Sequence, residues 1–283
     1  MRTTTQANRI LHSVTYVILG LGAVAMMFPL VWMVLTSLKT NNEILAAGSA
    51  WWPKSPQWQN YWEAFTSLPF GRWTLNTVLI TLFTIVGALL SNVVVAYGFA
   101  RFRVRENNVL FMVLLATMML PSAVTMIPQF ILFKDVGWVN TYYPLIVPAF
   151  FGDAFFIFLL RQFFRTIPKD FEDAARLDGL GPVGILWRII VPLSLPVLTT
   201  VAIFQFNGAW NDFMTPLIYL NDSSKYTLAL GINFFKGGAG VTEVPQWNYL
   251  MAASTISLLP SLILFFFGQK YFIEGISISS GIK

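Results

Sequence analysis

Residues 73–105 read WTLNTVLITLFTIVGALLSNVVVAYGFARFRVR. The run as far as Ala100 contains no Asp, Glu, Lys or Arg, and Arg101, Arg103 and Arg105 follow it directly. A membrane-spanning helix needs roughly 20 mostly apolar residues, and basic residues gather at the cytoplasmic end of such helices. The stretch therefore predicts a transmembrane helix whose C-terminal end lies in the cytoplasm.

Similar apolar runs recur along the rest of the chain, and none shows the alternation of apolar and polar residues that marks a membrane strand. The first run is longer than the core of a signal peptide and has no small-residue cleavage site in the usual place, so we expect a retained helix. The prediction is an all-α, polytopic membrane protein with one transmembrane domain over residues 1–283. Its six predicted spans are about 10–38, 73–100, 107–133, 142–162, 187–211 and 248–270.

The composition agrees with this class. Apolar residues make up 56% of the chain and charged residues 11%, against about 45–50% and 25% in ordinary soluble domains. These values exclude a soluble enzyme, a disordered chain and a disulfide-stapled secreted domain. The chain has no cysteine and one histidine, so we expect neither a thiolate nor a histidine-rich metal site.

The distribution of basic residues predicts the orientation. With the N-terminus in the cytoplasm, 12 of the 18 Lys and Arg residues fall in cytoplasmic segments, although the outside segments are longer. Both termini are then cytoplasmic, and the chain presents no basic face for nucleic acid. The cytoplasmic set is Arg2, Arg9, Arg101, Arg103, Arg105, Arg161, Arg165, Lys169, Arg176, Arg188, Lys270 and Lys283.

Two outside segments differ in character. Residues 39–72 are rich in Trp and Tyr, which is typical of a short amphipathic helix at the membrane interface, and contact with a partner is the alternative. Residues 212–243 are polar and Gly-rich, which predicts an exposed flexible loop.

Sequence motifs for catalysis are missing. The chain contains no G-x-x-x-x-G-K-[ST], H-E-x-x-H or G-x-S-x-G pattern. Asp153 is the one acidic or basic residue deep in a predicted span. It either pairs with a polar group of a neighbouring helix or accepts a hydrogen bond from a transported substrate. We therefore expect a non-catalytic pore or scaffold whose energy comes from another protein.

A short helix outside the membrane is predicted between the fourth and fifth spans. Thr166 is a possible N-cap, Pro168 suits the first turn, and Gly179 ends the helix. A helix of about ten residues is marginal alone, so it needs a surface on which to dock. Acidic residues favoured in its first turn are Asp170, Glu172 and Asp173.

The residues of this helix carry a family resemblance. Residues 173–179, DAARLDG, are followed by IVPLSLP at 190–196. This pair of motifs resembles the "EAA" loop of permease subunits of binding-protein-dependent ABC importers. Asp173 stands where the family usually has Glu, and Glu172 precedes it, so the sequence leaves open which acid makes the main contact.

Further motifs resemble carbohydrate permeases of the maltose-permease type, in particular the G-type subunit. The resemblance implies the ABC type I importer permease fold, with residues 163–187 as the coupling loop. The motifs are PLVW at 29–32, SLK at 37–39, NY at 60–61, NT at 76–77, YGFAR at 97–101, FLLRQFF at 158–164, WNDF at 210–213, PL at 216–217 and QKYFIEGI at 269–276.

The resemblance implies a set of partners. These are a second, F-type permease subunit, two ATPase subunits that bind ATP and Mg, an extracytoplasmic binding protein and the bilayer of a bacterial or archaeal inner membrane. No cofactor or metal is expected in this chain. The implied cargo is a sugar or oligosaccharide. Glycerol-phosphate or another polyol is the alternative within this class, and a secondary transporter or a membrane-embedded enzyme is the alternative outside it.

The resemblance also implies roles for residues. The tail from Glu274 to Lys283 is expected to reach between the ATPases. Residues expected to couple to the ATPase are Glu172, Asp173, Ala174, Ala175, Asp178 and Gly179. A loop expected either to enter the binding protein or to be disordered contains Phe235, Lys236, Gly237, Gly238, Ala239 and Gly240. Candidates for the translocation path are Asn92, Asp153, Gln205, Asn207 and Trp210.

Overall fold

The computed structural model describes residues 2–46, 48, 50–102, 104–237 and 244–279, and this part of the chain contains helices and turns but no strand. It divides into two compact units. The first comprises Met1–Phe70 and Ile232–Leu258, and the second comprises Gly71–Gly231 and Leu259–Lys283.

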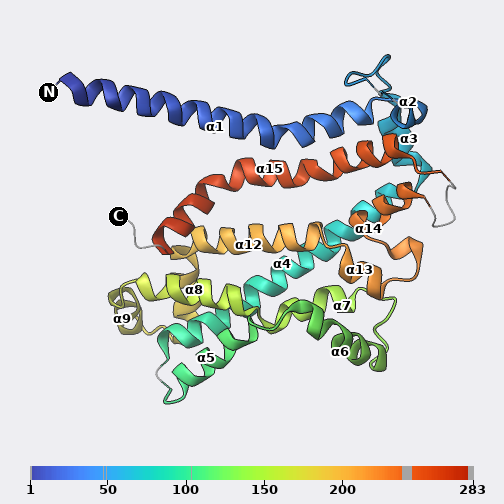
Figure 1. Ribbon diagram of the computed structural model, residues 1–283. Coiled ribbons are helices and arrows are strands. Elements are labelled where there is room, and N and C mark those ends of the chain that lie inside the picture. Colours follow the sequence, from blue (N-terminus) through green and yellow to red (C-terminus); the bar gives the residue numbers. More distant parts are fainter. Residues whose placement is uncertain (1, 47, 49, 103, 238–243, 280–283) are drawn as a thin grey trace. The chain divides into compact units, whose positions relative to one another are not determined.

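The first unit joins the long N-terminal helix to two short helices and to the start of the last helix (Figure 1). Its elements are α1 (Arg2–Ser37), α2 (Asn41–Leu45), α3 (Gln59–Ser67), η4 (Asn233–Lys236) and the beginning of α15 (Trp247–Ser279).

Asparagine side chains hold this unit together where α1 ends. Asn60 donates from Nδ2 to the carbonyl oxygens of Ser37, at 2.7 Å, and Lys39, at 2.8 Å. Its Oδ1 accepts a bond from Asn248 of α15, and Asn41 accepts one from the backbone N–H of Trp247. Buried backbone groups need such partners, which explains polar residues between apolar helices.

The segment rich in Trp and Tyr, residues 39–72, is only partly helical. The predicted interfacial helix is α3, where Trp58 at the N-cap and Trp62 are exposed. Trp51 lies outside any helix, with its ring edge-on to those of Phe28 and Trp32 at 5.5 and 5.4 Å.

The second unit contains the remaining elements. They are α4 (Phe70–Arg101), α5 (Asn107–Thr117), α6 (Ser122–Asp135), α7 (Tyr143–Ile146), η1 (Val147–Phe151), α8 (Ala154–Thr166), α9 (Asp170–Leu177), α10 (Pro182–Ile185), η2 (Leu186–Ile190), α11 (Val191–Leu193), α12 (Leu195–Trp210), α13 (Met214–Tyr219), η3 (Ser223–Lys225) and α14 (Leu228–Ile232).

Among the described residues, four helices are long and apolar enough to cross a membrane, or up to six if each of two bent helix pairs counts as one span. Both of these helix pairs are sharply bent. α5 meets α6 at 95°, and Pro182–Leu193 meets α12 at 81°. Pro121 ends the first break, directly before α6, and Pro196 follows the second; proline lacks an N–H and disfavours helix in the residue before it.

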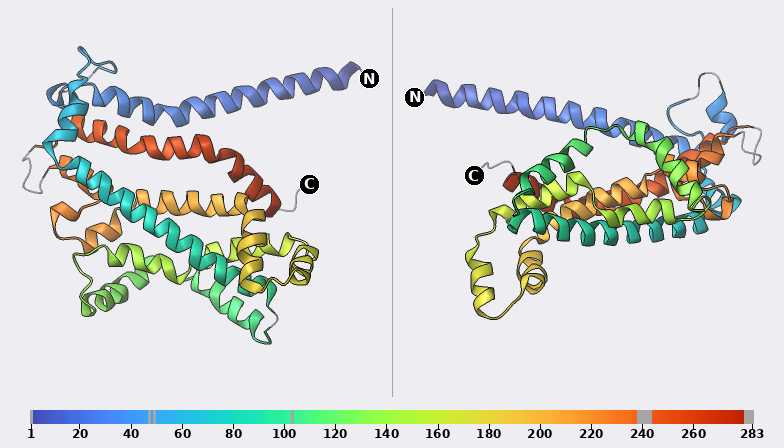
Figure 2. Two further views of the ribbon diagram at one scale, coloured as in Figure 1. Left: turned by 180° about the vertical axis from the view of Figure 1, so that it is seen from behind. Right: turned by 90° about the horizontal axis from the view of Figure 1, so that it is seen from below.

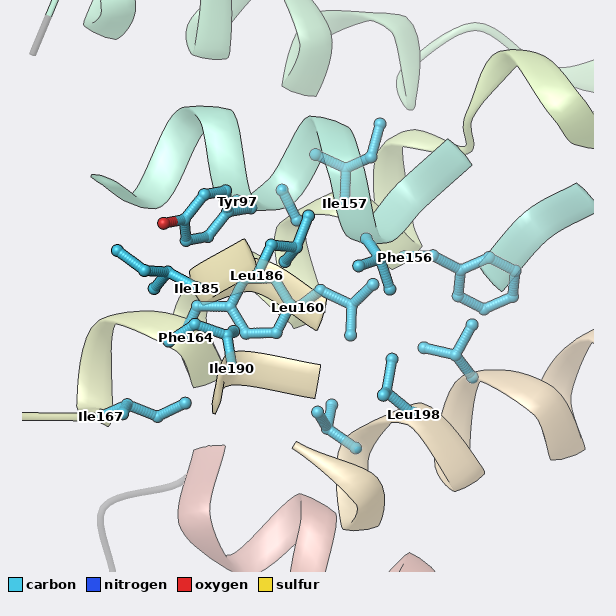
Figure 3. Close-up of a cluster of buried hydrophobic side chains, with 14 of the residues drawn as sticks. Tyr97, Phe156, Ile157, Leu160, Phe164, Ile167, Ile185, Leu186, Ile190 and Leu198 are labelled. Atoms are coloured by element: carbon cyan, nitrogen blue, oxygen red, sulfur yellow. The ribbon is translucent and has the colours of Figure 1, made fainter. Parts of the chain in front are cut away.

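A buried apolar cluster lies between α4, α8, α9, η2 and α12 (Figure 3). Leu160 and Phe164 of α8 form its middle, and Tyr97 of α4 and Ile190 of η2 cover them. Ala175 brings α9 into the same cluster. The predicted coupling loop is therefore anchored in the core of this unit.

The expectation of an exposed flexible loop over residues 212–243 is wrong for its described part. α13, η3, α14 and η4 occupy most of it, and Leu228 and Leu230 are buried. Side chains at the start of α4 pair with backbone groups of this segment. Trp73 Nε1 donates to the carbonyl of Ser223, and Thr77 Oγ1 accepts from the N–H of Leu228, both at 2.7 Å.

Candidate functional site

Two neighbouring cavities in the second unit contain three of the five residues predicted for a translocation path. The larger has a volume of about 310 Å³ and the smaller about 140 Å³. Thr84, Leu145 and Gln205 line both. The larger one is lined in addition by Ala88, Asn92, Pro148, Ala149, Gly152 and Asp153.

Asn92 is a fully buried amide that links two helices beside the larger cavity. Its Nδ2 donates to the carbonyl oxygen of Ala88 in α4 at 2.6 Å. Its Oδ1 accepts a bond of 2.7 Å from the backbone N–H of Asp153. The neighbouring Ser91 Oγ donates to the carbonyl of Ala149 at 2.9 Å. α4 is thereby tied to the point where the fourth span breaks.

That break is made by Gly152 and Asp153. Gly152 has φ of +88°, a conformation that side chains disfavour. Asp153 then caps α8: its Oδ1 accepts from the N–H groups of Phe155, at 2.9 Å, and Phe156, at 3.1 Å. The first N–H groups of a helix lack partners within the helix, and an Asp at the N-cap supplies one. Asp153 therefore marks a helix start inside the span.

The other path candidates lie elsewhere. Asn207 is exposed and donates to the carbonyl of Ile203 in its own helix at 3.0 Å. Trp210 is buried and stacks on Phe206, with ring centroids 5.3 Å apart. Neither residue lines either of the two cavities. Gln205, in contrast, makes no side-chain hydrogen bond to the described part of the chain.

The second predicted site is the short helix α9, which protrudes with α10 from the other helices of its unit (Figure 2, right). It begins after Lys169, so the predicted N-cap is wrong: Thr166 ends α8, and its hydroxyl donates to the carbonyl of Phe163 at 2.7 Å. The predicted end is confirmed. Gly179 has φ of +84° and completes a Schellman motif, in which the N–H of Leu180 donates to the carbonyl oxygen of Ala175.

The two acids in the motif point in different directions. Glu172 is 2% exposed and forms a buried ion pair with Arg101 at the end of α4. Arg101 also donates from Nη2 to the carbonyl oxygen of Ile167 at 2.8 Å. Asp173 is exposed and pairs with Arg176, one turn along α9, at 3.2 Å. Glu172 is thus the structural acid and Asp173 the accessible one.

The two alanines diverge in the same way. Ala175 is 4% exposed and belongs to the buried cluster, whereas Ala174 is exposed. Exposed apolar residues flank Ala174 at helical spacing: Phe171 precedes it by three, and Leu177, which is 91% exposed, follows it by three. This apolar stripe was not among the predicted coupling residues, although its i, i+3, i+6 spacing is present in the sequence.

The comparison with protein families decides the class of the chain. Residues 92–278 match the family described as "Binding-protein-dependent transport system inner membrane component". The chain belongs to this family. It is a multi-pass membrane permease subunit of ABC importers and not an enzyme.

Curated relatives cover nearly the whole permease. The probable ABC transporter permease protein YurM of Bacillus subtilis is 33% identical over 270 residues, which are 94% of this chain and 87% of that protein. The arabinooligosaccharides transport system permease protein AraQ of Bacillus subtilis is 33% identical over 91% of this chain and 90% of its own. The sn-glycerol-3-phosphate transport system permease protein UgpE of Yersinia pestis is 29% identical over 92% and 94%.

A solved structure shares the fold of the permease. One chain of a bacterial ABC transporter involved in the import of the acidic polysaccharide alginate matches with a TM-score of 0.84 and 26% identity. The match covers 94% of this chain and 98% of that chain. The all-helical importer permease fold predicted from the sequence is confirmed.

The loop expected to enter the binding protein is only partly visible in the permease. Phe235 is 3% exposed: its ring packs edge-on against Tyr249 at 5.9 Å, and its carbonyl accepts from Gln246 N–H at 2.8 Å. Its side chain is therefore part of the first unit's packing, whereas Lys236 is exposed and Gly237 has φ of +81°. Gly238, Ala239 and Gly240 lie outside the described residues.

The C-terminal tail begins as helix. α15 extends to Ser279, so the first part of the segment expected to reach between the ATPases is a continuation of the last span. The final residues, 280–283, lie outside the part of the chain that the structure describes.

Proposed function

We propose that this permease and a second membrane subunit form the path by which a sugar or oligosaccharide crosses the membrane. An extracytoplasmic binding protein delivers the cargo, and two partner ATPases, which hold ATP and Mg, supply the energy. Membership of the importer family and the relatives named for sugar transport support this assignment.

One observation supports a sugar path most directly: Gln205, whose amide is free of partners in the described chain, lies on the wall shared by the two cavities. Asp153 adds a carboxylate and Thr84 a hydroxyl to the same lining. Amides and carboxylates bond sugar hydroxyls, and the surrounding Leu and Pro side chains suit the apolar faces of the ring.

Glycerol-phosphate is the second candidate, because one relative is named for its transport. A phosphate group is recognised in proteins by Arg or Lys side chains. Neither residue type occurs among the described residues that line the two cavities, and Asp153 and Asp212 carry the charge there. The lining contributed by this chain therefore favours an uncharged cargo.

We assign the contact with the ATPase to the exposed stripe of Phe171, Ala174 and Leu177, with Asp173 and Asp178 at its margins. These side chains are exposed on a helix that protrudes from its unit (Figure 2). Glu172 and Ala175 lie on the opposite, buried face of α9, where Glu172 pairs with Arg101 and Ala175 packs in the apolar cluster. In this assignment α9 and both termini lie in the cytoplasm, in line with the distribution of basic residues.

Uptake by the complete complex reconstituted in liposomes tests the cargo. Neutral oligosaccharides and sn-glycerol-3-phosphate are offered to the wild type, to Gln205→Ala and to Asn207→Ala. We expect the wild type to take up the sugar. Gln205→Ala should remove one hydrogen bond to the sugar, which weakens its binding by roughly 1 kcal/mol and raises the half-saturating sugar concentration about fivefold.

Asn207→Ala is the matched control, because this exposed amide lies two positions away on α12 and outside the cavity lining. It should behave as the wild type. Uptake of the phosphate ester without any uptake of sugar would contradict the proposed cargo, and equal effects of the two substitutions would contradict the proposed path.

A further inference from the structure

α9 is attached to α4 by a buried ion pair as well as by apolar packing. Arg101 has two partners: its guanidinium forms the ion pair with Glu172 on α9, and its Nη2 donates to the carbonyl oxygen of Ile167, the C-cap of α8, at 2.8 Å. Both side chains of the ion pair are buried, at 5% and 3% exposure. The planar guanidinium fork reaches the charge of Glu172 and the carbonyl of Ile167 at the same time, so it restricts how α9 can shift against α4, whereas apolar surfaces can slide.

Further contacts continue this attachment toward the cavity. Arg161 of α8 donates from Nε to the carbonyl of Phe99 in α4 at 3.3 Å. Asn92 of α4 accepts from the N–H of Asp153, which caps α8. The contacts follow the same order along both helices, so α4 and α8 run parallel and are bonded from the cavity to the start of α9.

We propose that Arg101 is a positioning residue that makes α9 and α4 move together, so that displacement of α9 reaches the cavity lining. This inference rests on the proposed function, in which ATPase subunits displace α9. It assigns a positioning role to the arginine that ends the second predicted span. A movement of α4 would change the larger cavity directly, because Thr84, Ala88 and Asn92 of α4 line it.

Arg101→Lys is the decisive variant, because it keeps a buried positive charge for Glu172 but cannot bond both partners as the fork does. In the reconstituted complex we expect normal co-purification of the ATPases and a fall of about tenfold in cargo carried per ATP hydrolysed. Arg176→Lys is the matched control: Arg176 also lies near Glu172, at 3.9 Å, but its side chain is 60% exposed. It should couple as the wild type does.

A second measurement follows the movement itself. The chain contains no cysteine, so single labels can be placed at Asp170→Cys on α9 and at Leu90→Cys on α4, both exposed. ATP should change the signal of both labels in the wild type. In Arg101→Lys the α9 label should still respond, while the α4 label should not.

An unchanged ratio of cargo to ATP in Arg101→Lys, or an α4 label that still responds to ATP, would overturn the inference and leave the proposed function intact. Loss of assembly in Arg101→Lys would also overturn it, because a purely structural role would then suffice. A wild-type complex without transport, or without any response of the α9 label, would overturn the proposed function and the inference with it.

Discussion

Buried polar residues in and beside the apolar runs satisfy backbone groups at helix ends and breaks. Asn92 accepts a hydrogen bond from the N–H of Asp153, and Thr77 accepts one from the N–H of Leu228. Asn60 donates to two carbonyl oxygens at the end of α1. In a membrane an unpaired backbone group is costly. Single amides and hydroxyls therefore determine where this chain can leave the helical conformation.

Gly179→Ala tests one such position. The left-handed conformation at φ of +84° costs a residue with a Cβ about 1–2 kcal/mol, so the end of α9 should fray and ATP hydrolysis stimulated by loaded binding protein should fall. Gly98→Ala is the control: Gly98 lies inside α4 with open space around it, where Ala favours the helix by about 1 kcal/mol. Equal activities of the two variants would contradict the role given to Gly179.

Asp222 offers a pH test outside the spans. The hydrogen bond from the N–H of Ser224, at 2.9 Å, lowers the pKa of its carboxyl below the ordinary 3.8. The unfolded chain keeps the ordinary pKa, so the turn is stabilised above that pH and loses this stabilisation as the pH falls through the lowered pKa. A carboxyl-carbon NMR titration should give a midpoint below 3.8; a midpoint at or above this value would refute the bond.

At the scale of elements, broken helices distinguish this chain from a bundle of straight spans. The α5–α6 pair, the Gly152 break and the π-helical segment η2 before Pro192 all interrupt apolar runs. Such interruptions are tolerated at membrane depth where protein or a cavity supplies the partners. The Gly152 break borders the larger cavity, which agrees with this rule.

The two faces of α9 can be separated with one substitution made at two adjacent positions. Ala175→Leu inserts bulk into the buried cluster and should destabilise the chain by about 1–3 kcal/mol, measured as a lower Tm in detergent. Ala174→Leu adds the same atoms to an exposed position, so the free energy of unfolding should change by less than about 0.5 kcal/mol, whereas co-purification of the ATPase should fall. Matching results for both variants would contradict the assignment of the faces.

At the scale of the whole molecule, the chain is one part of a larger assembly. Leu177 is 91% exposed on a polar helix, and helix α1 is exposed along almost its whole apolar length. Exposed apolar surface of this extent marks contact with other proteins or with lipid. The scarce charges lie mostly outside the spans, which fits a subunit that shapes a path and is driven by its partners.

Leu177→Ser tests the contact with the ATPase at this scale. The side chain contributes almost nothing to the fold of this chain, so thermal stability should stay within about 0.5 kcal/mol. Loss of its burial in an interface should cost about 1.5–3 kcal/mol of binding, seen as weaker retention of the ATPase during purification. Phe151→Ser is the control for the loss of an exposed apolar side chain elsewhere, because Phe151 is 80% exposed; retention unchanged in Leu177→Ser would contradict the docking surface.

The orientation is also tested on the whole molecule. With both termini in the cytoplasm, alkaline phosphatase fused after Lys283 should be inactive in cells, because it needs an oxidising compartment for its disulfides. A cytoplasmic reporter fused at the same place should be active. An active phosphatase fusion would contradict the predicted orientation, because it would place the C-terminus outside the cytoplasm.

The sequence alone determined the membrane class, the apolar segments, the position of α9 and the family. These properties depend on composition and on runs of neighbouring residues, which need no tertiary contact to be recognised. Gly179 belongs to this group as well, since a helix end in the left-handed conformation demands glycine locally.

Only the tertiary structure decided which of two adjacent residues faces inward. Glu172 and Asp173, Ala174 and Ala175, or the nearby Gln205 and Asn207, are alike in chemistry and lie within one helical turn of each other. Successive residues of a helix point about 100° apart, so their roles depend on what packs against that helix. Arg101 lies far from Glu172 in the sequence, and only folding brings the two charges together.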